Sequence, residues 1–220
     1  MKRTHWLVLA ALILGVTSFM SAHAQSPATH QHSFGDAQKW AHIFDDPKRD
    51  EWQKPHEVIE KLALAPTAAV ADIGAGTGYF AVRLANMLPQ GRVYAVDIEP
   101  DMVKYLADRA KREKLLNMQA IAAAPDDQRL PVQVDLILLV DTYHHISERE
   151  RYFGNLRSLL KNGGRVAVID FRLDSPDGPP KKVRIAPESV KQEMARAGYA
   201  LQSEYSFLPR QYFLVFVPQR

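Results

Sequence analysis

Short apolar segments alternate with helical patterns along most of this chain, and this alternation constrains the fold more than any other feature. The apolar segments are continuous, which is typical of strands in a parallel sheet that helices cover on both faces. They lie at residues 68–73, 92–98, 117–123, 134–140 and 165–171. Amphipathic helical patterns lie at residues 79–88, 99–113, 147–162 and 187–198. The sequence therefore predicts an α/β fold around a mostly parallel sheet.

The two ends of this region differ from its middle. Residues 200–207 and 211–217 are strand-like with no helix between them, which predicts an antiparallel hairpin at the C-terminal end. The helix at 147–162 is expected to begin with a cap at Ser147 and to end before Gly163 and Gly164. Upstream, residues 55–64 form one more helical pattern, and residues 40–55 are expected to be irregular because aromatic and charged residues mix there.

The N-terminus has the three parts of a secretory signal peptide. Lys2 and Arg3 form a positive start, an apolar stretch runs from Trp6 to Met20, and Ala22-His23-Ala24 is a small-residue cleavage site. The apolar stretch is shorter than the roughly 20 residues that span a bilayer, which disfavours an uncleaved anchor. We expect cleavage after Ala24, a periplasmic location and no stable membrane span after cleavage. The remaining segments are expected to be a flexible leader at 25–38, an N-terminal lid or helical segment at 39–66, and one domain at 67–220.

Composition excludes several classes of function. The formal charge is +3, and removal of Lys2 and Arg3 leaves +1. Basic residues neither cluster in runs nor alternate with aromatic residues, so nucleic-acid binding is not expected. The chain has no cysteine, which excludes disulfides, thiolate metal sites and cysteine nucleophiles, including thiol-dependent arsenic methylation.

A glycine-rich loop, "VADIGAGTGYF", follows the first predicted strand at residues 70–80. Gly74 allows a tight turn, Gly76 allows a ligand to approach the backbone, and Gly78 allows close packing where the next helix begins. A simple turn is the plainer alternative. The spacing G-x-G-x-G differs from the dinucleotide fingerprint G-x-G-x-x-G, which disfavours a nicotinamide cofactor. Asp72 precedes the loop, and a carboxylate there favours a ligand with a positive amino group and no phosphate.

A second acid, Asp97, ends the next predicted strand. In an open parallel sheet this position suits a carboxylate that accepts hydrogen bonds from both ribose hydroxyls. The alternative is an aspartate that only caps the helix beginning near Pro100. A nucleoside with a cationic amino-acid tail satisfies both acids, and S-adenosylmethionine is such a molecule.

From about Phe44 to Pro218 the sequence resembles the class I S-adenosylmethionine-dependent methyltransferases, in the small-molecule group that includes the ubiquinone/menaquinone C-methyltransferases. The resemblance lies in "VADIGAGTGYF", "VYAVDIEPDMV", "VDLILLVDTYHHI" and "LLKNGGRVAVIDF", which occur in the family's order and spacing. It implies a Rossmann-like, seven-stranded, mostly parallel sheet with helices on both faces. It implies S-adenosylmethionine as cofactor and a small-molecule acceptor that it does not identify. The Asn-Pro-Pro-Tyr signature of nucleic-acid amino-methylating enzymes is missing.

The resemblance also implies roles for particular residues. Gly74, Ala75 and Gly76 would line the methionine part, and Asp72 would hold its amino group. Asp97 would take the ribose hydroxyls, with Ile98 beside the adenine. The family has an acid near the adenine amine where this chain has Asp126 and Asp127, of which Asp126 is the preferred candidate. Family members often use an N-terminal segment as a lid, and Phe44, Arg49, Asp50 and Trp52 are candidates for it.

The catalytic candidates follow the fourth predicted strand, beside the expected methyl group. They are Asp141, His144 and His145, with Tyr143 nearby. Histidine titrates near neutral pH and can act as a base. In the structural alternative, one histidine caps the next helix and the other packs on the sheet. A metal site formed by these three residues is a further alternative that their spacing disfavours.

These observations leave two leading functions. One is methyl transfer to a small organic acceptor by in-line displacement at the sulfonium, for which the protein must orient the nucleophile and exclude water. The other is non-catalytic binding of S-adenosylmethionine or a nucleoside in the cell envelope. The oligomeric state does not follow from the sequence.

Overall fold

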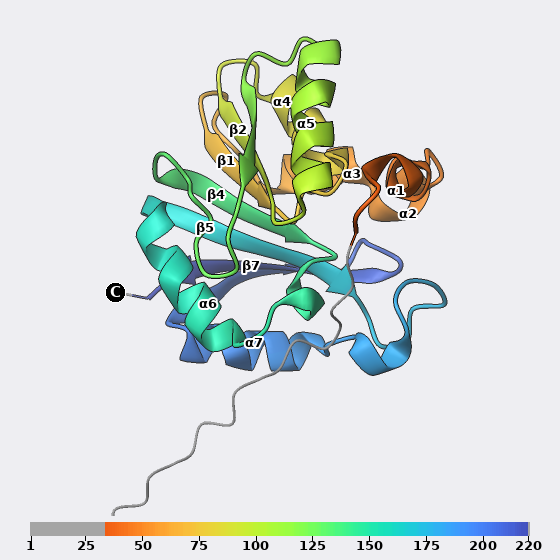
Figure 1. Cartoon of the computed structure of the whole chain (residues 1–220). Coiled ribbons are helices and arrows are strands. Elements are labelled where there is room, and N and C mark those ends of the chain that lie inside the picture. Colours follow the sequence, from red (N-terminus) through yellow and green to blue (C-terminus); the bar gives the residue numbers. More distant parts are fainter. Residues whose placement is uncertain (1–33, 220) are drawn as a thin grey trace, which may run out of the picture.

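The structure, a computed structural model, describes residues 34–219. It has a central seven-stranded sheet with helices on both faces (Figure 1). The strands are β1 (Ala69–Ile73), β2 (Arg92–Asp97), β3 (Met118–Ala122), β4 (Val134–Val140), β5 (Leu160–Phe171), β6 (Tyr199–Tyr205) and β7 (Gln211–Pro218). The helices are α1 (Ala37–Phe44), α2 (Arg49–Gln53), α3 (Pro55–Lys61), α4 (Tyr79–Met87), α5 (Pro100–Arg112), α6 (Arg149–Leu156) and α7 (Pro187–Arg196), with short 3₁₀ turns η1 (Tyr143–His145), η2 (Arg157–Leu159) and η3 (Lys181–Val183).

The strand order is β3-β2-β1-β4-β5-β7-β6. β3, β2, β1, β4 and β5 pair in parallel, whereas β7 is antiparallel to both β5 and β6. This confirms the predicted mostly parallel sheet with a C-terminal antiparallel hairpin. The order reverses between β1 and β4, and in open α/β sheets ligands bind at the carboxyl ends of the strands beside such a reversal.

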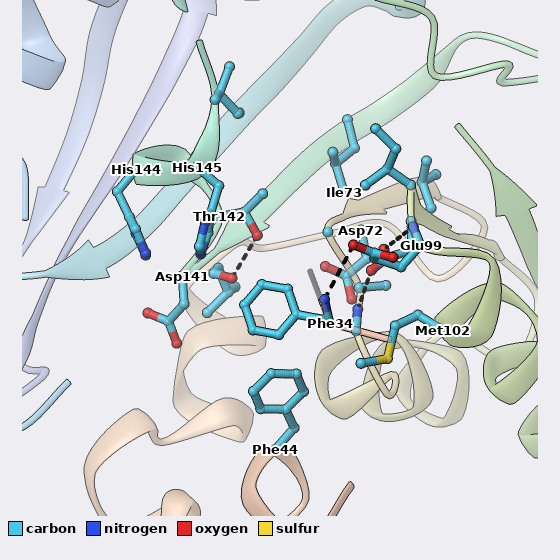
Figure 2. A pocket seen from close by; sticks show the side chains of 18 of the residues that line it. Phe34, Phe44, Asp72, Ile73, Glu99, Met102, Asp141, Thr142, His144 and His145 are labelled. Carbon is cyan, nitrogen blue, oxygen red and sulfur yellow. Dashed lines mark hydrogen bonds between the residues drawn. The ribbon is translucent and has the colours of Figure 1, made fainter. Parts of the chain in front are cut away.

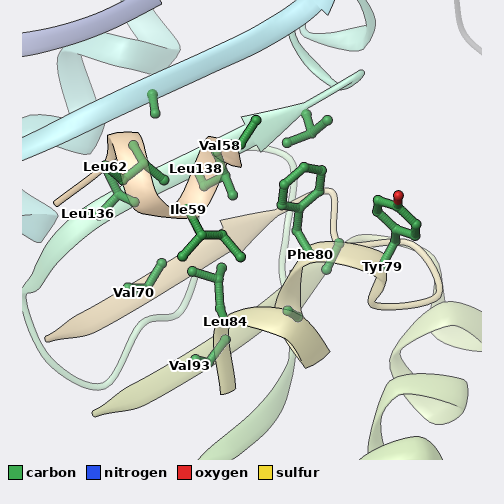
Figure 3. Packing of buried hydrophobic residues seen from close by; sticks show 14 of the residues in the cluster. Val58, Ile59, Leu62, Val70, Tyr79, Phe80, Leu84, Val93, Leu136 and Leu138 are labelled. Carbon is green, nitrogen blue, oxygen red and sulfur yellow. The ribbon is translucent and has the colours of Figure 1, made fainter. Parts of the chain in front are cut away.

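The sheet is buried on both faces because its central strands are mostly apolar. Along β4, Leu136 and Leu138 join one core cluster with α3, α4 and Leu106 of α5, while Ile137 and Leu139 join a second cluster with α6 and α7. This alternation follows from the two-residue period of a strand. Figure 3 shows the first cluster, in which Val58 and Ile59 of α3 and the following Leu62 pack over Leu136 and Leu138.

Two local predictions were wrong. Residues 40–55 are not irregular, because they include most of α1 and all of α2, and α1 begins with the Asp36 side chain accepting the Lys39 N–H. The helix expected at 147–162 begins after Glu148, which adopts φ 46° without a side-chain cap, and ends at Leu156. Residues 160–164 instead extend β5, where the pairing with β4 shifts between Val134 and Leu136.

The N-terminal predictions fall mostly outside the described residues. The signal peptide at 1–24 and residues 25–33 of the leader lie in that part. Residues 34–38 are described: the Phe34 N–H donates to Glu99 over 3.2 Å, and α1 begins at Ala37, two residues before the boundary drawn from the sequence. Within residues 34–219, no helix combines the length and apolarity needed to cross a membrane.

Candidate functional site

A cavity of about 1120 Å³ opens at the carboxyl ends of β1, β2, β4 and β5. The sheet forms its floor, and α1 and α2 supply Trp40, Phe44, Arg49 and Trp52 to its wall. Of the four lid candidates, Phe44, Arg49 and Trp52 line the cavity, whereas Asp50 lies outside the lining and pairs with Arg83 over 2.8 Å. Their role as a lid stays a prediction. Figure 2 shows Phe34 and Phe44 facing the residues that follow β1 and β4.

The glycine loop is built into this cavity by its backbone. Gly74, Gly76 and Gly78 have φ values of 72°, 57° and 93°, which side-chain-bearing residues rarely adopt. A Cβ on Gly74 would lie 2.4 Å from Oγ1 of Thr142, so the loop lies directly against the residues that follow β4. Gly74, Ala75 and Gly76 line the cavity. Gly78 instead begins α4 and packs against Leu106, outside the cavity lining.

Asp72 lies at the end of β1 and is only 3% exposed, yet it lines the cavity. Burial disfavours its charged form and raises its pKa to about 7, and the charge of Asp97 adds to this effect. A cation bound beside Asp72 would compensate for that penalty. The side chain therefore suits an amino group and opposes a phosphate.

Asp97 ends β2 and accepts two backbone N–H groups, from Gly76 over 2.8 Å and from Glu99 over 3.0 Å. It thus joins the glycine loop to the start of α5, and its contact with ribose hydroxyls stays a prediction. Burial raises its pKa, and the backbone donors oppose that shift. The carboxylate lines the cavity beside Ile98, which is 55% exposed and offers an apolar surface to a ring.

The two acids proposed for the adenine amine lie differently. Asp126 lines the cavity and forms an ion pair with Arg151 over 3.1 Å. Asp127 lies outside the cavity lining, and its side chain accepts the N–H of Arg129 over 2.8 Å. This arrangement favours Asp126, in agreement with the preference drawn from the sequence.

Asp141 follows β4 in a left-handed conformation with φ 55°. Arg49 and Gln53 of α2 donate to its Oδ2 over 3.3 and 3.2 Å, and Gln211 of β7 donates to its Oδ1. Burial raises the pKa of Asp141 to about 6 against the opposing charge of Arg49. The side chain therefore ties the N-terminal helices to the sheet at the place where a methyl acceptor would lie.

The two histidines of η1 have different surroundings. His144 is buried, and its Nδ1 lies 2.8 Å from Oδ2 of Asp170 on β5. Burial lowers the pKa of His144, but the hydrogen bond and charge of Asp170 outweigh it and raise the pKa above its ordinary value of 6.5. His145 contacts Phe34 edge-on at 5.5 Å between ring centroids. Both histidines and Asp141 line the cavity, but residues 34–219 contain no group of three or more His, Asp or Glu side chains placed to hold a metal ion.

Several cavity and supporting residues were not expected from the sequence. Gln53 and Gln211 are 158 positions apart and join through their amide groups over 3.1 Å. Phe34 falls within the expected leader, and Trp40 within the segment expected to be irregular. No local pattern identifies such residues, because long-range packing alone brings them to the cavity. Asp170, Phe171 and Arg172 are different, because their place at the end of the fifth predicted strand predicts that they face the cavity, and of these three Phe171 lines it.

The acids and glycines at the β1 and β2 ends fit a cationic nucleoside. Asp72, Asp97 and Glu99 surround this end of the cavity, and the glycine loop presents backbone without side chains. A diphosphate would meet these carboxylates and would be repelled by them. The donor and acceptor set therefore agrees with S-adenosylmethionine and disagrees with a dinucleotide.

Comparisons with known proteins also point to methyltransferases. A family model described as a methyltransferase domain matches residues 71–166, from within β1 to within β5. Malonyl-[acyl-carrier protein] O-methyltransferase of Geobacter sulfurreducens is 28% identical over 60% of this chain and 47% of its own length. A ubiquinone/menaquinone biosynthesis C-methyltransferase of Cupriavidus taiwanensis is 29% identical over 51% of this chain and 47% of its own length. The chain thus spans about half the length of these relatives.

Solved structures share the fold over more of the chain. A methyltransferase dependent on S-adenosylmethionine, from Aquifex aeolicus, superposes with a TM-score of 0.76 at 25% identity, covering 82% of this chain and 97% of that one. One from Clostridium acetobutylicum has a TM-score of 0.65 over 83% of this chain at 16% identity, which shows the fold alone. The domain match and the shared fold imply S-adenosylmethionine as the cofactor, as predicted.

Proposed function

We propose that this chain, which carries a methyltransferase domain of the S-adenosylmethionine-dependent kind, transfers a methyl group to a small organic acceptor. The observation that supports this most is one continuous cavity. Its β1–β2 end carries the acids and glycines suited to the cofactor, and its β4–β5 end carries ionisable side chains beside open space. The acceptors named for the relatives differ from one another, so none of them is assigned to this chain.

In this proposal, residues at the β1–β2 end hold the cofactor. Asp72 holds the amino group, the backbone of Gly74 to Gly76 lines the methionine part, and Asp97 accepts from the ribose hydroxyls. Ile98 and Asp126 contact the adenine. When bound, S-adenosylmethionine supplies a sulfonium-activated methyl group as the electrophile.

The chain's own contribution is orientation and exclusion of water. Trp52 of α2 and Phe171 of β5 lie 5.5 Å apart between ring centroids and border the second end of the cavity. Holding two reactants in line can lower the barrier by roughly 7–11 kcal/mol without any dedicated nucleophile. A cavity that holds both reactants in this way suits in-line displacement.

Calorimetric titration tests the cofactor first. We expect S-adenosylmethionine and S-adenosylhomocysteine to bind, and NAD to give no heat of binding because the glycine spacing and the acids oppose a diphosphate. Binding of NAD in preference to S-adenosylmethionine would refute the proposal.

The second candidate is a non-catalytic binding protein, and the predicted export favours it, because S-adenosylmethionine is made in the cytoplasm. Incubation with S-adenosylmethionine carrying a labelled methyl group and an extract of envelope metabolites separates the two functions. Label in an extracted small molecule supports the enzyme. Tight cofactor binding with no label transferred from either envelope or cytoplasmic extracts supports the binding protein.

A further inference from the structure

The second end of the cavity has aromatic walls. Trp52 of α2 and Phe171 of β5 border that end, whereas Phe34 lies edge-on to His145 and Phe44 lies against the glycine loop at Gly76. Phe34 and Phe44 lie 5.7 Å apart between ring centroids (Figure 2). Aromatic faces attract flat rings through stacked and edge-to-face contacts, so these walls favour a planar acceptor.

Within residues 34–219, three arginines line the cavity, and each is paired with a carboxylate of the same cavity. Arg49 pairs with Asp141 over 3.3 Å, Arg210 with Asp177 over 3.0 Å, and Arg151 with Asp126 over 3.1 Å. An anionic acceptor would have to separate one of these pairs and leave a carboxylate without its partner. Asp72, Asp97 and Glu99 add further negative charge. The cavity therefore suits a cationic cofactor beside an uncharged acceptor.

His144 lines the second end of the cavity, and its pairing with Asp170 behind it suits proton transfer. Asp170 engages Nδ1 of His144 at 2.8 Å and also accepts the His144 backbone N–H over 3.2 Å, so the ring orientation is fixed. Engagement of Nδ1 by a carboxylate favours the tautomer with its proton on Nδ1, in which Nε2 is the basic nitrogen. In Figure 2 His144 extends from η1 toward the same space as His145 and Asp141.

We propose that the acceptor is an uncharged aromatic or conjugated molecule with an acidic hydroxyl group, and that His144 removes the hydroxyl proton while Asp170 positions the imidazole. This inference rests on the proposed methyl transfer and adds the substrate class and the base. Asp170 is a positioning residue, because it acts through His144.

The step balances without a further reactant. The hydroxyl proton moves to Nε2 of His144, and the oxygen lone pair forms the new bond to the methyl carbon. The electron pair of the broken carbon–sulfur bond remains on sulfur, which becomes a neutral thioether. The imidazolium then loses its proton to solvent. The products are an aryl or enol methyl ether, S-adenosylhomocysteine and one proton.

His144 acts as a base only when neutral, so its neighbours set the pH range. The charged and titratable groups around it are Asp170 on β5, Asp141 after β4, Arg149 on α6, His145 on η1 and, through Asp170, Tyr212 on β7. The two carboxylates raise the pKa of His144 above 6.5 and outweigh the burial and the charge of Arg149 that lower it. Proton removal should therefore increase as the pH rises through a midpoint above 6.5.

A matched pair of probes tests the acceptor class without turnover. Protein saturated with S-adenosylhomocysteine is titrated at mildly acidic pH with para-nitrophenol, which is neutral there, and with para-nitrobenzoate, which is an anion. We expect the phenol to bind about tenfold or more tightly than the benzoate, because the carboxylate must disrupt an arginine pair. Equal or tighter binding of the benzoate, or no binding of the phenol, overturns the inference.

Absorbance of the bound nitrophenolate tests the base. In the wild-type protein we expect bound phenol to ionise at a lower pH than free phenol. His144→Gln should bind the phenol but lose this effect, and Asp170→Asn should shift the ionisation toward that of free phenol. Asp174→Asn is the matched control, because Asp174 pairs with Arg172 at an exposed site outside the cavity lining. An unaltered spectrum in His144→Gln overturns the assignment.

Two checks keep the outcomes separate. Thermal unfolding of each variant shows whether it folds, and if Asp170→Asn does not, the two probes and His144→Gln still decide the question. Binding of S-adenosylmethionine to the wild-type protein is measured in the same samples. Absence of that binding refutes the proposed function, whereas cofactor binding with methylation of carboxylates and not of phenols refutes only this inference.

Discussion

Asp97 illustrates how one side chain serves both the fold and a ligand. Its carboxylate accepts N–H groups from Gly76 and Glu99, so it fixes the glycine loop against the start of α5. The same carboxylate lines the cavity, where ribose hydroxyls can donate to its remaining lone pairs. A hydrogen bond to a charged acceptor contributes on the order of 1.5–3 kcal/mol to the free energy of binding.

We therefore expect Asp97→Ala to raise the dissociation constant for S-adenosylmethionine by about tenfold or more. Isothermal titration calorimetry measures this directly. The control is Asp108→Ala, which removes an exposed aspartate paired with Lys104 on α5. An unchanged constant in Asp97→Ala would remove the ribose assignment, and Asp97→Asn, which keeps an acceptor oxygen, should have the smaller effect.

Asp72, like Asp97, is a carboxyl group whose charged form is disfavoured by burial, and its pKa rises from 3.8 to about 7. Between these two values the folded protein keeps a proton that the unfolded chain releases. This group therefore lowers the stability of the ligand-free protein as the pH rises through that window. A bound ammonium group reverses the balance by favouring the carboxylate.

Binding of S-adenosylmethionine at a pH just below 7 should thus release a proton from Asp72. Titrations in buffers with different ionisation enthalpies measure the number of protons released. Asp72→Asn should bind more weakly and lose the release assigned to this group. Equal proton release in the wild type and the variant would show that Asp72 does not contact the amino group.

At the scale of elements, the glycine loop depends on close contact with the residues after β4. A Cβ on Gly74 would meet Thr142 at 2.4 Å, and the φ of 72° disfavours any L side chain. Left-handed backbone costs an ordinary residue roughly 1–2 kcal/mol, and the steric overlap adds to that cost. The contact joins the β1 loop to the β4 end, which is where the two halves of the cavity meet.

Gly74→Ala should therefore lower the free energy of unfolding by roughly 2 kcal/mol or more, as measured by chemical denaturation. The double variant Gly74→Ala/Thr142→Ala should recover the steric part but not the backbone part. The control is Gly163→Ala, where φ is 82° and no neighbour lies within 4 Å, so only the backbone cost remains. Equal losses for the two single variants would show that the Thr142 contact is unimportant.

The N-terminal helices are held to the sheet by polar contacts that converge on Asp141. Arg49 donates to Asp141 and to the carbonyl of Phe44 over 2.7 Å, and its guanidinium lies 4.3 Å from the ring centroid of Tyr79. Gln53 adds hydrogen bonds to Asp141 and Gln211. These contacts place α1 and α2 over the cavity.

Arg49→Ala should accelerate amide hydrogen exchange in α1 and α2 by about tenfold or more, while exchange in β1 and β4 stays unchanged. Mass spectrometry of peptic fragments resolves these segments. Glu57→Ala is a suitable comparison, since Glu57 forms an exposed pair with Lys54 outside the cavity lining. Uniform acceleration in all elements would mean that Arg49 supports the whole fold and not the lid.

At the scale of the whole molecule, export remains a prediction from the sequence, because residues 1–33 lie outside the described part of the structure. Expression of the full chain in a Gram-negative host tests it. We expect the mature protein in the periplasmic fraction to begin at Gln25, as determined by N-terminal sequencing. A variant with Ala22→Arg and Ala24→Arg should stay unprocessed, because cleavage sites need small residues. Protein that retains Met1 in the cytoplasm would contradict export.

The sequence predicted the sheet because its strands are continuous apolar runs, and it predicted Asp72, Asp97 and Asp141 as site residues because each lies at the carboxyl end of a strand or just after it. It did not reveal α1 and α2, which are short and whose apolar residues pack against parts of the chain far away in sequence. The sequence pattern also predicted that the helix at α6 continues to residue 162, whereas β5 begins at Leu160, which pairs with Val134 of β4. Gly78 and Asp127 match sequence motifs, yet they lie outside the cavity lining.

The sequence by itself determined which elements form and which strand ends carry acids and glycines, because these properties depend on local periodicity and on residue type. Only the tertiary structure decided that Asp170 holds His144, that Gln53 meets Gln211, and that each cavity arginine is paired. The physical reason is range. Hydrogen bonds and ion pairs act over a few ångströms, and only the folded sheet brings residues that are distant along the chain within that range.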